Sequence, residues 1–529
     1  MNEFIIISAN IFTGDPANPR AQAVYIKGNR IKAVGTIPMV KNLAPRDVNV
    51  LDLPGCLITP GLMDGHCHFT SIGGSLENLN FRDIPSLFDC RLMVSQAVST
   101  ASPGEWIIGR GWNDTLWAEN REPLKQDLDD ISPDNPVMLT RVCGHSAWMN
   151  SKALEIAGIT ARTPDLPGGK IDKDPVTHEP TGIIRETLEL ISDHIPPLTK
   201  QQLRRAALSA QKEVLRLGIT CVHSLENLDS FKAIRELDRT KGLKVRVYHS
   251  LHVEDIQTAE KEGFDINQNT DHLWLGHVKL FADGSLGANT ALLHDPYEDQ
   301  PHNVGLAFLD TKALRAGVEF AYKRGYGVMI HAIGDKAVTN ALESIAGARK
   351  KYPCQPRDRI EHVQLFRSQD LSLFIDHHIT ASVQPVFLAT DRATAEKKWG
   401  INRCKNAYAW QTLMDKNIPL QFGSDSPVEP VNPLLGIYTA VERKDYRDKI
   451  NGTWFAGQSL TLEQAITGFT QQAAYTSQRE KDLGKIAPGK LADLTIFNQD
   501  LFDIPRDQWP EVEVKMTIIN GEIVYEKPV

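Results

Sequence analysis

The sequence predicts an α/β protein built on a TIM (β/α)8 barrel, and two observations carry this prediction. Short apolar segments alternate with helix-like segments along the middle of the chain, which is the pattern of successive βα units. Side chains that suit a metal ion stand where several of these strands should end, and barrel sites lie at the carboxyl ends of the strands. At 529 residues the chain has room for a large barrel with added domains.

The barrel is expected to occupy residues 57–484. Its first strand is a buried, uncharged segment at 57–63, which leads directly to His66. Helix-like segments at 200–217, 312–324 and 336–350 separate later strands. Those strands, which bring the total to eight, are expected at 219–223, 245–250, 277–282, 327–331, 359–363, 379–384 and 419–424.

Both ends of the chain are rich in short alternating strands. Gly28-Asn29 and Asn520-Gly521 are hairpin turn signals that stand between such strands. We expect residues 1–56 and 485–529 to complete one composite β-sandwich domain. This pairing is a hypothesis, because periodicity does not identify strand partners.

An insert at about 72–198 interrupts the βα pattern. It contains Trp106, Trp112 and Trp117 and a proline-rich stretch. Because the insert follows the first barrel strand, it leaves from the catalytic face. We therefore expect it to cover the active site and to influence substrate choice.

The composition is that of an ordinary globular protein, with 41% hydrophobic and 23% charged residues. The net charge of −8 gives no reason to expect nucleic acid or a membrane as a partner. Seven scattered cysteines without a C-x-x-C pair, no signal peptide and no long apolar segment predict a cytoplasmic protein. A small-molecule substrate is the expected partner, and a homo-oligomer is left open.

Two histidines, His66 and His68, follow the first strand with one residue between them. Alternating side chains of a strand place both imidazoles on one face. Two neutral imidazoles on one face suit a single metal ion. The alternative is a pair of surface histidines in a loop.

Four further polar residues stand at the expected ends of strands 4, 5, 6 and 8. They are Lys279, His331, His362 and Asp425. One histidine at a strand end is usually structural. Histidines from three strands, with a lysine and an aspartate at the same barrel face, instead indicate a metal centre.

Taken together, these motifs resemble the amidohydrolase superfamily, and within it the amidohydrolase-3 subgroup that includes N-substituted formamide deformylase. The resemblance covers nearly the whole chain, and its motifs are Pro60-Gly61-Leu62-Met63-Asp64-Gly65-His66-Cys67-His68, Gly109-Arg110-Gly111-Trp112-Asn113, Lys279-Leu280-Phe281-Ala282-Asp283-Gly284, His331-Ala332-Ile333-Gly334-Asp335, Glu361-His362, Gly423-Ser424-Asp425-Ser426-Pro427 and Gly489-Lys490-Leu491-Ala492-Asp493-Leu494. The resemblance implies a TIM barrel beside a composite β-sandwich. It also implies hydrolysis of a non-peptide C–N bond by metal-activated water.

The resemblance also implies roles for the residues at the strand ends. Lys279 is similar to a lysine that is carboxylated in two-metal members, and Asp425 to a ligand that also accepts a proton from the attacking water. The metal is expected to be zinc, as one ion or two. The alternative for Lys279 is an ordinary cation paired with Asp283. The implied metal ligands are His66, His68, Lys279, His331, His362 and Asp425.

The insert contributes second-rank candidates. His145 is a candidate for catalysis and substrate binding, with a loop-capping histidine as the alternative. Arg110 and Trp112 are candidates for lining the substrate pocket. The alternative for Trp112 is packing within a small core of the insert.

The leading functional hypothesis is a metal-dependent hydrolase of a small amide, formamide or cyclic amide. A second hypothesis is a non-catalytic regulatory or binding protein on an amidohydrolase scaffold. A third is a metal-dependent deaminase, isomerase or lactonase that uses the same site. The sequence alone does not separate the third hypothesis from the first.

Overall fold

The computed structural model describes residues 3–82, 84–141, 146–166, 169–266, 268–353, 357–447 and 452–528. The chain forms two compact units. The larger unit comprises Met1–Gly73 and Leu203–Val529, and the smaller unit comprises Gly74–Gln202. Each is described separately.

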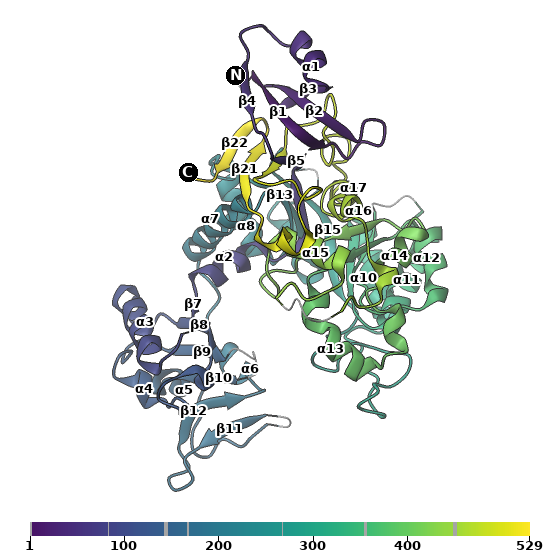
Figure 1. Ribbon diagram of the computed structural model, residues 1–529. Coiled ribbons are helices and arrows are strands. Elements are labelled where there is room, and N and C mark those ends of the chain that lie inside the picture. Colours follow the sequence, from purple (N-terminus) through teal and green to yellow (C-terminus); the bar gives the residue numbers. More distant parts are fainter. Residues whose placement is uncertain are drawn as a thin grey trace. The chain divides into compact units, whose positions relative to one another are not determined.

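Eight parallel strands form the core of the larger unit, and the expected TIM barrel is confirmed (Figure 1). In sheet order they are β6 (Leu62–Cys67), β13 (Ile219–Leu225), β14 (Arg246–His252), β15 (Leu273–Phe281), β16 (Gly327–Ala332), β17 (Arg359–His362), β18 (Thr380–Val383) and β19 (Leu420–Phe422). The ring closes just beyond β19. There the backbone N–H groups of Ser424 and Asp425 donate to the carbonyl oxygen of His66, at 3.2 and 2.7 Å.

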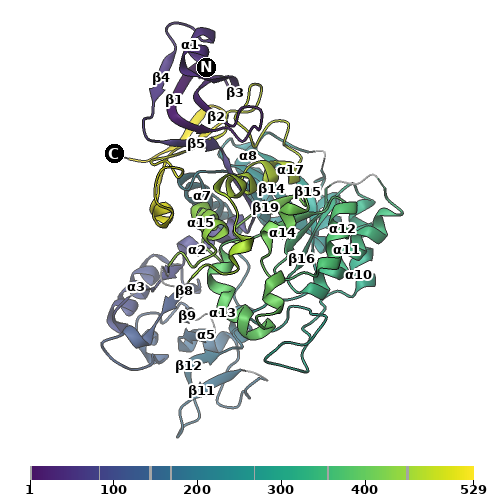
Figure 2. The same ribbon diagram turned by 45° about the vertical axis from the view of Figure 1, so that its right-hand side comes forward.

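Helices connect the strands and pack through apolar faces. In α8 (Leu228–Arg239), for example, Phe231, Ile234 and Leu237 are buried at helical spacing. Helices α10 (Thr311–Tyr322), α11 (Asp335–Arg349) and α12 (Leu371–Asp376) lie side by side (Figure 2). The remaining α-helices described in this unit are α1 (Ile37–Leu43), α7 (Lys200–Arg216), which begins in the smaller unit, α9 (Ile256–Lys261), α13 (Phe387–Trp399), α14 (Trp410–Asp415), α15 (Pro433–Glu442), α16 (Leu462–Gly468) and α17 (Gln471–Thr476).

Strands from both chain ends pair in one sheet, as Figure 1 shows by the purple and yellow strands beside each other. The central join is antiparallel pairing of β5 with β20, with Ile58 opposite Ile496. The sheet order is β22 (Glu522–Glu526), β21 (Val514–Ile519), β20 (Leu494–Phe497), β5 (Leu57–Pro60), β1 (Glu3–Phe12), β2 (Arg20–Lys27) and β3 (Arg30–Gly35), and β4 (Asn49–Asp52) pairs with β1. Both chain ends thus contribute to one eight-stranded sheet.

The single strand expected at 57–63 is two strands, which meet at Gly61. β5 belongs to the terminal sheet and β6 to the barrel. A Cβ at Gly61 would lie 2.3 Å from Oγ1 of the buried Thr220, so only glycine fits where the chain passes from one sheet to the other. The backbone N–H of Gly61 donates to the carbonyl oxygen of Asp493, at 2.8 Å. The first barrel strand therefore begins at Leu62.

The smaller unit has its own sheet and core. Trp112, Trp117 and Trp148 pack together in its hydrophobic core, with ring centroids 5.8 to 6.3 Å apart. Its sheet has the order β11 (Lys170–Lys173), β12 (Pro180–Arg185), β10 (Ser146–Met149), β9 (Val137–Arg141), β8 (Ile107–Trp112) and β7 (Leu79–Asn80). Its helices are α3 (Leu87–Thr100), α4 (Gln126–Asp129), α5 (Ser151–Ile156) and α6 (Glu189–Ser192), and α2 (Phe69–Glu77) spans the boundary between the units. That this insert covers the active site stays a prediction.

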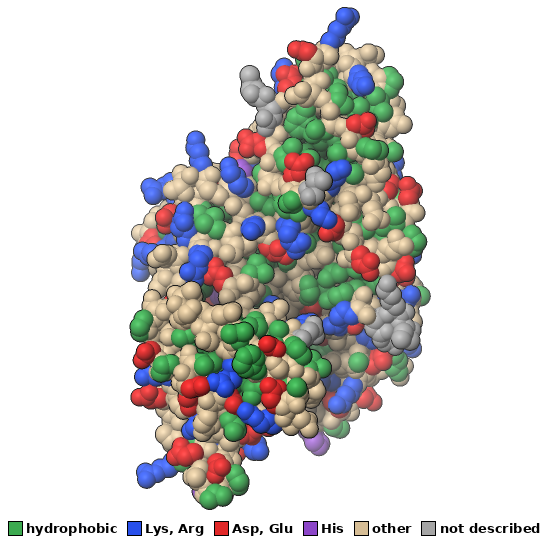
Figure 3. Space-filling view, turned by 60° about the vertical axis from the view of Figure 1, so that its left-hand side comes forward, with side chains coloured by type: hydrophobic (Ala, Val, Ile, Leu, Met, Phe, Trp, Pro, Cys, Tyr) green, Lys and Arg blue, Asp and Glu red, His purple; other side chains and the backbone are tan. Residues whose placement is uncertain are grey.

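On the face drawn in Figure 3, acidic and basic side chains are interspersed and do not gather into a patch of one sign. The net charge of −8 is thus not concentrated on this face. Among the described residues, none of the helices has the length and apolar character needed to cross a bilayer.

Candidate metal centre

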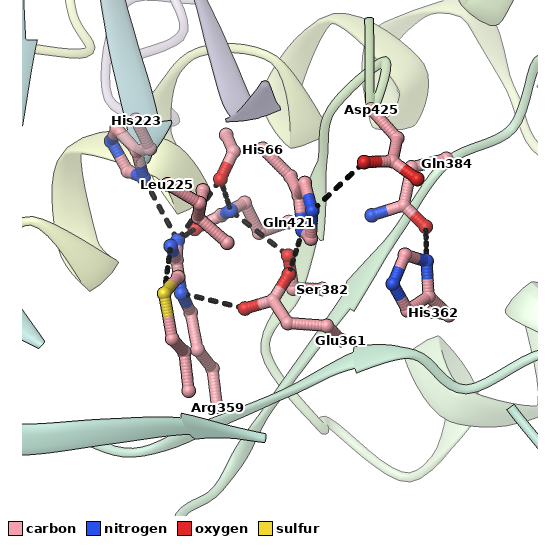
Figure 4. Close-up of polar contacts among 12 residues, drawn as sticks. His66, His223, Leu225, Arg359, Glu361, His362, Ser382, Gln384, Gln421 and Asp425 are labelled. Atoms are coloured by element: carbon pink, nitrogen blue, oxygen red, sulfur yellow. Dashed lines mark hydrogen bonds and ion pairs between the residues drawn. The ribbon is translucent and has the colours of Figure 1, made fainter. Parts of the chain in front are cut away.

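His66 and His68 converge with Asp425 where β6 and β19 end. The Nε2 atoms of both histidines lie 3.1 Å from the same oxygen, Oδ1 of Asp425. His66 is buried and His68 is partly exposed. Figure 4 shows the imidazole of His66 directed at the carboxylate of Asp425. His66 and His68, from the strand at one edge of the barrel sheet, thus contact Asp425, which follows the strand at the other edge.

His362, at the end of β17, joins this cluster. One ligand atom each from His66, His362 and Asp425 lies within 4.8 Å of the others. The φ angles of His362 and Asp425 are +74° and +59°, a left-handed conformation that costs about 1–3 kcal/mol for such residues. The strained backbone is therefore at His362 and Asp425, two of the three residues whose side chains form the cluster.

His331, at the end of β16, lies against His362. Their ring centroids are 4.4 Å apart. Its Nε2 atom is 2.9 Å from the carbonyl oxygen of Gly284 and 3.6 Å from Oδ1 of Asp283. His331 therefore lies beside the group of His66, His362 and Asp425, because its ring packs against the ring of His362.

Asp283 has a structural role. Its carboxylate accepts backbone hydrogen bonds from Leu292, Ile333 and Gly334, at 2.8 to 3.0 Å. These bonds tie together the loops after β15 and β16. No ion pair between Asp283 and Lys279 is present in the described part of the chain.

Lys279, on β15, is almost fully buried. Burial lowers the pKa of its ammonium group to about 8. Its Nζ lies 4.9 Å from the ring centroid of Phe281, and no hydrogen bond to Nζ occurs among the described residues. A minor fraction of this side chain, about a tenth at pH 7, is thus a neutral, nucleophilic amine, which is far more than for an ordinary lysine.

Electrostatics favour neutral His331 and His362 and an ionised Asp425, whereas Glu361 and Asp425 outweigh burial and raise the pKa of His66, whose proton a bound cation would displace. Burial lowers the pKa of His331 to about 4 and also lowers the pKa of His362. Burial opposes the charge on Asp425, yet His66 holds the pKa of that carboxyl well below its usual range. Neutral imidazoles and a carboxylate are the ligands that Zn²⁺ prefers, so these residues fit a divalent cation.

Hydrogen bonds behind the cluster fix the orientation of the imidazoles. Nδ1 of His66 faces Glu361, Nδ1 of His68 lies 2.8 Å from the carbonyl oxygen of Leu225, and Nδ1 of His362 lies 2.8 Å from Oε1 of Gln384. Each Nε2 is consequently free to face the centre. Such partners are typical of histidines that bind metals.

Glu361 is held by Arg359 on the same strand. Nε of Arg359 lies 2.8 Å from Oε1 of Glu361, and both side chains are fully buried. Nη1 of Arg359 donates to the carbonyl oxygen of Gly65 and to Oε1 of Gln421, each at 3.1 Å, and lies 2.9 Å from Nδ1 of His223. Figure 4 shows the resulting path from Asp425 through His66 and Glu361 to Arg359.

Sequence reasoning assigned no role to Arg359, Glu361 or Gln384. The signal for the first two was a pair of opposite charges two residues apart on a strand expected to be buried, which places both on one face. The signal for Gln384 was a polar side chain at the expected end of a barrel strand.

Two of the three candidates in the insert, Arg110 and Trp112, are described, and both belong to the smaller unit. Trp112 is buried in the core of the smaller unit and donates from Nε1 to the carbonyl oxygen of Leu139, at 2.7 Å. Arg110 is exposed on β8 of the same unit. His145 lies outside the described residues. The substrate-binding roles of all three stay predictions.

Comparison with known proteins gives a consistent result. Residues 49–525 match the model of the amidohydrolase family. The chain is 33% identical to the putative amidohydrolase YtcJ of Bacillus subtilis, with 98% of each chain covered. It is 25% identical to N-substituted formamide deformylase of Arthrobacter pascens, over 100% of this chain and 99% of that one.

The fold is shared with a solved structure. An uncharacterized metal-dependent hydrolase from Pyrococcus furiosus superposes with a TM-score of 0.79 at 31% identity. The superposition covers 94% of this chain and 99% of that one.

Proposed function

Because the chain belongs to the amidohydrolase family, we propose that it is a zinc hydrolase of a non-peptide C–N bond in a small amide, formamide or cyclic amide. The observation that carries the proposal is the convergence of His66, His362 and Asp425, whose ligand atoms lie within 4.8 Å of one another. His68 contacts Asp425, His331 packs against His362, and Lys279 is near enough to reinforce burial in lowering the pKa of both His331 and His362. The donor set matches hydrolytic zinc centres, which bind the ion through histidines and carboxylates and keep a position open for water.

When bound, the ion would supply a water nucleophile near neutral pH and polarise the substrate carbonyl. His66, His68, His331, His362 and Asp425 are the residues that would hold it. Asp425 is placed to accept the proton of the attacking water and to pass it to the leaving nitrogen. A carboxylate that is ionised before the reaction can act as this base.

Asp425 is constrained for this role. Its backbone N–H donates to the carbonyl oxygen of His66 at 2.7 Å, which fixes the position from which its side chain extends. Two imidazoles share its Oδ1 oxygen at 3.1 Å. No hydrogen bond to its other carboxylate oxygen occurs within the described ranges, so this oxygen could accept from a water or a substrate.

We further propose that Lys279 is carboxylated. Its neutral amine would attack carbon dioxide, forming an N–C bond and releasing one proton, so that the lysine becomes an anionic carbamate. Burial, the lowered pKa and a Nζ atom without a hydrogen bond among the described residues support this reaction. Carbon-13 NMR with labelled bicarbonate should show a carbamate resonance that is absent from Lys279→Met.

A cytoplasmic location is part of the proposal. The described cysteines are free, buried thiols, as expected in a reducing compartment. Their positions are Cys56, Cys67, Cys90, Cys221 and Cys404.

The function is tested by turnover of a panel of small amides, formamides and cyclic amides. Zinc-loaded wild type is expected to hydrolyse at least one class, with products that gain one water by mass spectrometry. Folded His66→Ala and Asp425→Ala variants, checked by circular dichroism, should lose that turnover. Full activity in either variant contradicts the proposal. Metal-loaded wild type that is inert on the whole panel favours the binding-protein alternative, and an unchanged mass favours an isomerase. Ammonia released from amino-substituted heterocycles, with no carboxylate product from any amide, favours a deaminase.

A further inference from the structure

Gln384 is held rigidly beside the metal centre. It directly follows β18 and precedes Pro385, which restricts its backbone to extended conformations. Its carbonyl oxygen accepts a hydrogen bond from the backbone N–H of Phe387, at 3.1 Å. Its side chain is only 3% exposed, so both ends of the amide require partners within the protein or in a ligand.

One end of the amide serves His362. Oε1 of Gln384 lies 2.8 Å from Nδ1 of His362. For His362 to offer a lone pair to a cation at Nε2, its proton must be on Nδ1, and that N–H must donate to an oxygen. The oxygen of the Gln384 amide therefore faces His362, and its NH2 group takes the opposite direction.

The other end of the amide is unused. Nε2 of Gln384 is buried and has no hydrogen-bond partner among the described residues. Figure 4 shows this nitrogen on the side of the amide that faces Asp425 and His66. A buried donor without a partner, directed at a centre where a substrate must bind, indicates a group that is completed by that substrate.

We propose that the Gln384 amide donates a hydrogen bond to the substrate oxygen that becomes negatively charged during hydrolysis. This proposal rests on the proposed function. As the water oxygen bonds to the carbonyl carbon, the π electron pair of the C=O bond moves onto the carbonyl oxygen, and Asp425 takes the proton. The C–N bond then breaks, the electron pair returns to re-form C=O, and the nitrogen takes up the proton.

The position of this donor suits that charge. A preorganised N–H in a water-poor site stabilises a developing oxyanion without reorganisation, and loss of one such donor lowers kcat by roughly 10²–10³-fold. Gln384 thus has two separable roles. Its oxygen positions His362, and its nitrogen contacts the substrate.

Two substitutions separate these roles. Gln384→Glu keeps an oxygen for His362 but removes the donor, whereas the uncharged Gln384→Met removes both. Zinc affinity, measured by competition with a chromophoric chelator, should stay at or above the wild-type value in Gln384→Glu. It should fall roughly 10-fold or more in Gln384→Met, as for loss of a histidine partner. A similar loss of zinc affinity in both variants would show that Gln384 acts only by supporting metal binding and not by donating to the substrate. That result overturns the proposal.

A substrate-independent readout uses methylphosphonate, whose tetrahedral anionic oxygens mimic the intermediate. Calorimetry on proteins saturated with zinc should show binding to wild type and at least 10-fold weaker binding to both variants. If Gln384→Met binds methylphosphonate as tightly as the wild type does, weaker binding by Gln384→Glu reflects only repulsion between its carboxylate and the phosphonate. That result overturns the proposal. Absence of binding to the wild type overturns it as well.

Turnover gives the second readout. On any amide that the wild type hydrolyses, both variants at saturating zinc should lose kcat by about 10²-fold or more, with KM changed only a few-fold. An unchanged kcat in Gln384→Glu overturns the donor role. If the wild type hydrolyses none of the panel, the proposed function fails, while the phosphonate result still decides whether Gln384 binds an oxyanion.

Discussion

Glu361 contacts His66 and Arg359 at the same time, so that one buried carboxylate links a candidate metal ligand to a buried guanidinium. Burial opposes the charge of Glu361, but Arg359 and His66 outweigh it and keep the pKa of this carboxyl well below its ordinary value. The ionised carboxylate accepts from Nδ1 of His66 and directs Nε2 toward Asp425. The arrangement sets the orientation of His66 before any ion binds.

Removing the charge of Glu361 should weaken metal binding. In Glu361→Gln, the Nδ1 proton of His66 loses a charged acceptor and Arg359 loses its counter-ion. We expect zinc affinity to fall by roughly 10–100-fold, as for other partners of metal-binding histidines. Chelator competition measures this change. The matched control is Glu480→Gln, which breaks an ion pair with Arg357 outside the cluster, and an equal loss in both variants would contradict the prediction.

Replacing Asp425, the proposed base, should lower turnover strongly while the protein stays folded. Asp425→Asn keeps the size of the side chain but cannot accept the water proton. We expect kcat to fall by roughly 10²–10⁴-fold at saturating zinc, the usual contribution of a general base. Steady-state kinetics measures the effect, with the exposed Asp376→Asn at the end of α12 as control. Retention of most of the wild-type kcat in Asp425→Asn would exclude this base.

Removal of the metal should lower stability as well as activity. An ion that binds only the folded state stabilises it by about 2.7 kcal/mol at a free concentration 100 times Kd. Dialysis against a chelator should therefore lower Tm and abolish turnover, and added zinc should restore both. The shift should be smaller in His66→Ala at the same zinc concentration. Equal shifts in the two proteins would place the stabilising ion elsewhere.

The crossing between the terminal sheet and the barrel should be sensitive to a single methyl group. Gly61→Ala places a Cβ 2.3 Å from Oγ1 of Thr220 in a buried region. We expect a loss of about 1–3 kcal/mol in the free energy of unfolding, the usual cost of overpacking. Urea denaturation measures it. Gly74→Ala, whose Cβ meets no atom within 4 Å, is the control and should be neutral or stabilising.

Periodicity was sufficient to predict the barrel. The expected strand at 327–331 is β16 (Gly327–Ala332), and that at 219–223 is β13 (Ile219–Leu225). Barrel strands are buried and apolar, and the helices between them separate one strand from the next. Because each strand end lies at the same face, the polar residue that ends a strand could be identified without coordinates.

Other features depend on contacts between distant residues. The division of 57–63 into two strands at Gly61 depends on the proximity of Thr220, some 160 positions away. The role of Glu361 depends on the ring of His66 in another strand. His362 determines which way the Gln384 amide is turned, and so leaves its nitrogen without a hydrogen-bond partner in the described part of the chain. None of these follows from local sequence, because each is set by tertiary packing.

A cation is expected to bind where His66, His362 and Asp425 converge. X-ray diffraction from crystals of the zinc-loaded protein, recorded at the zinc absorption edge, tests this expectation most directly. We expect an anomalous peak within about 2.0–2.2 Å of imidazole nitrogens of His66 and His362 and of a carboxylate oxygen of Asp425. A zinc-loaded protein with no peak at this position, or with its zinc bound elsewhere, would show that these three residues do not form the metal site.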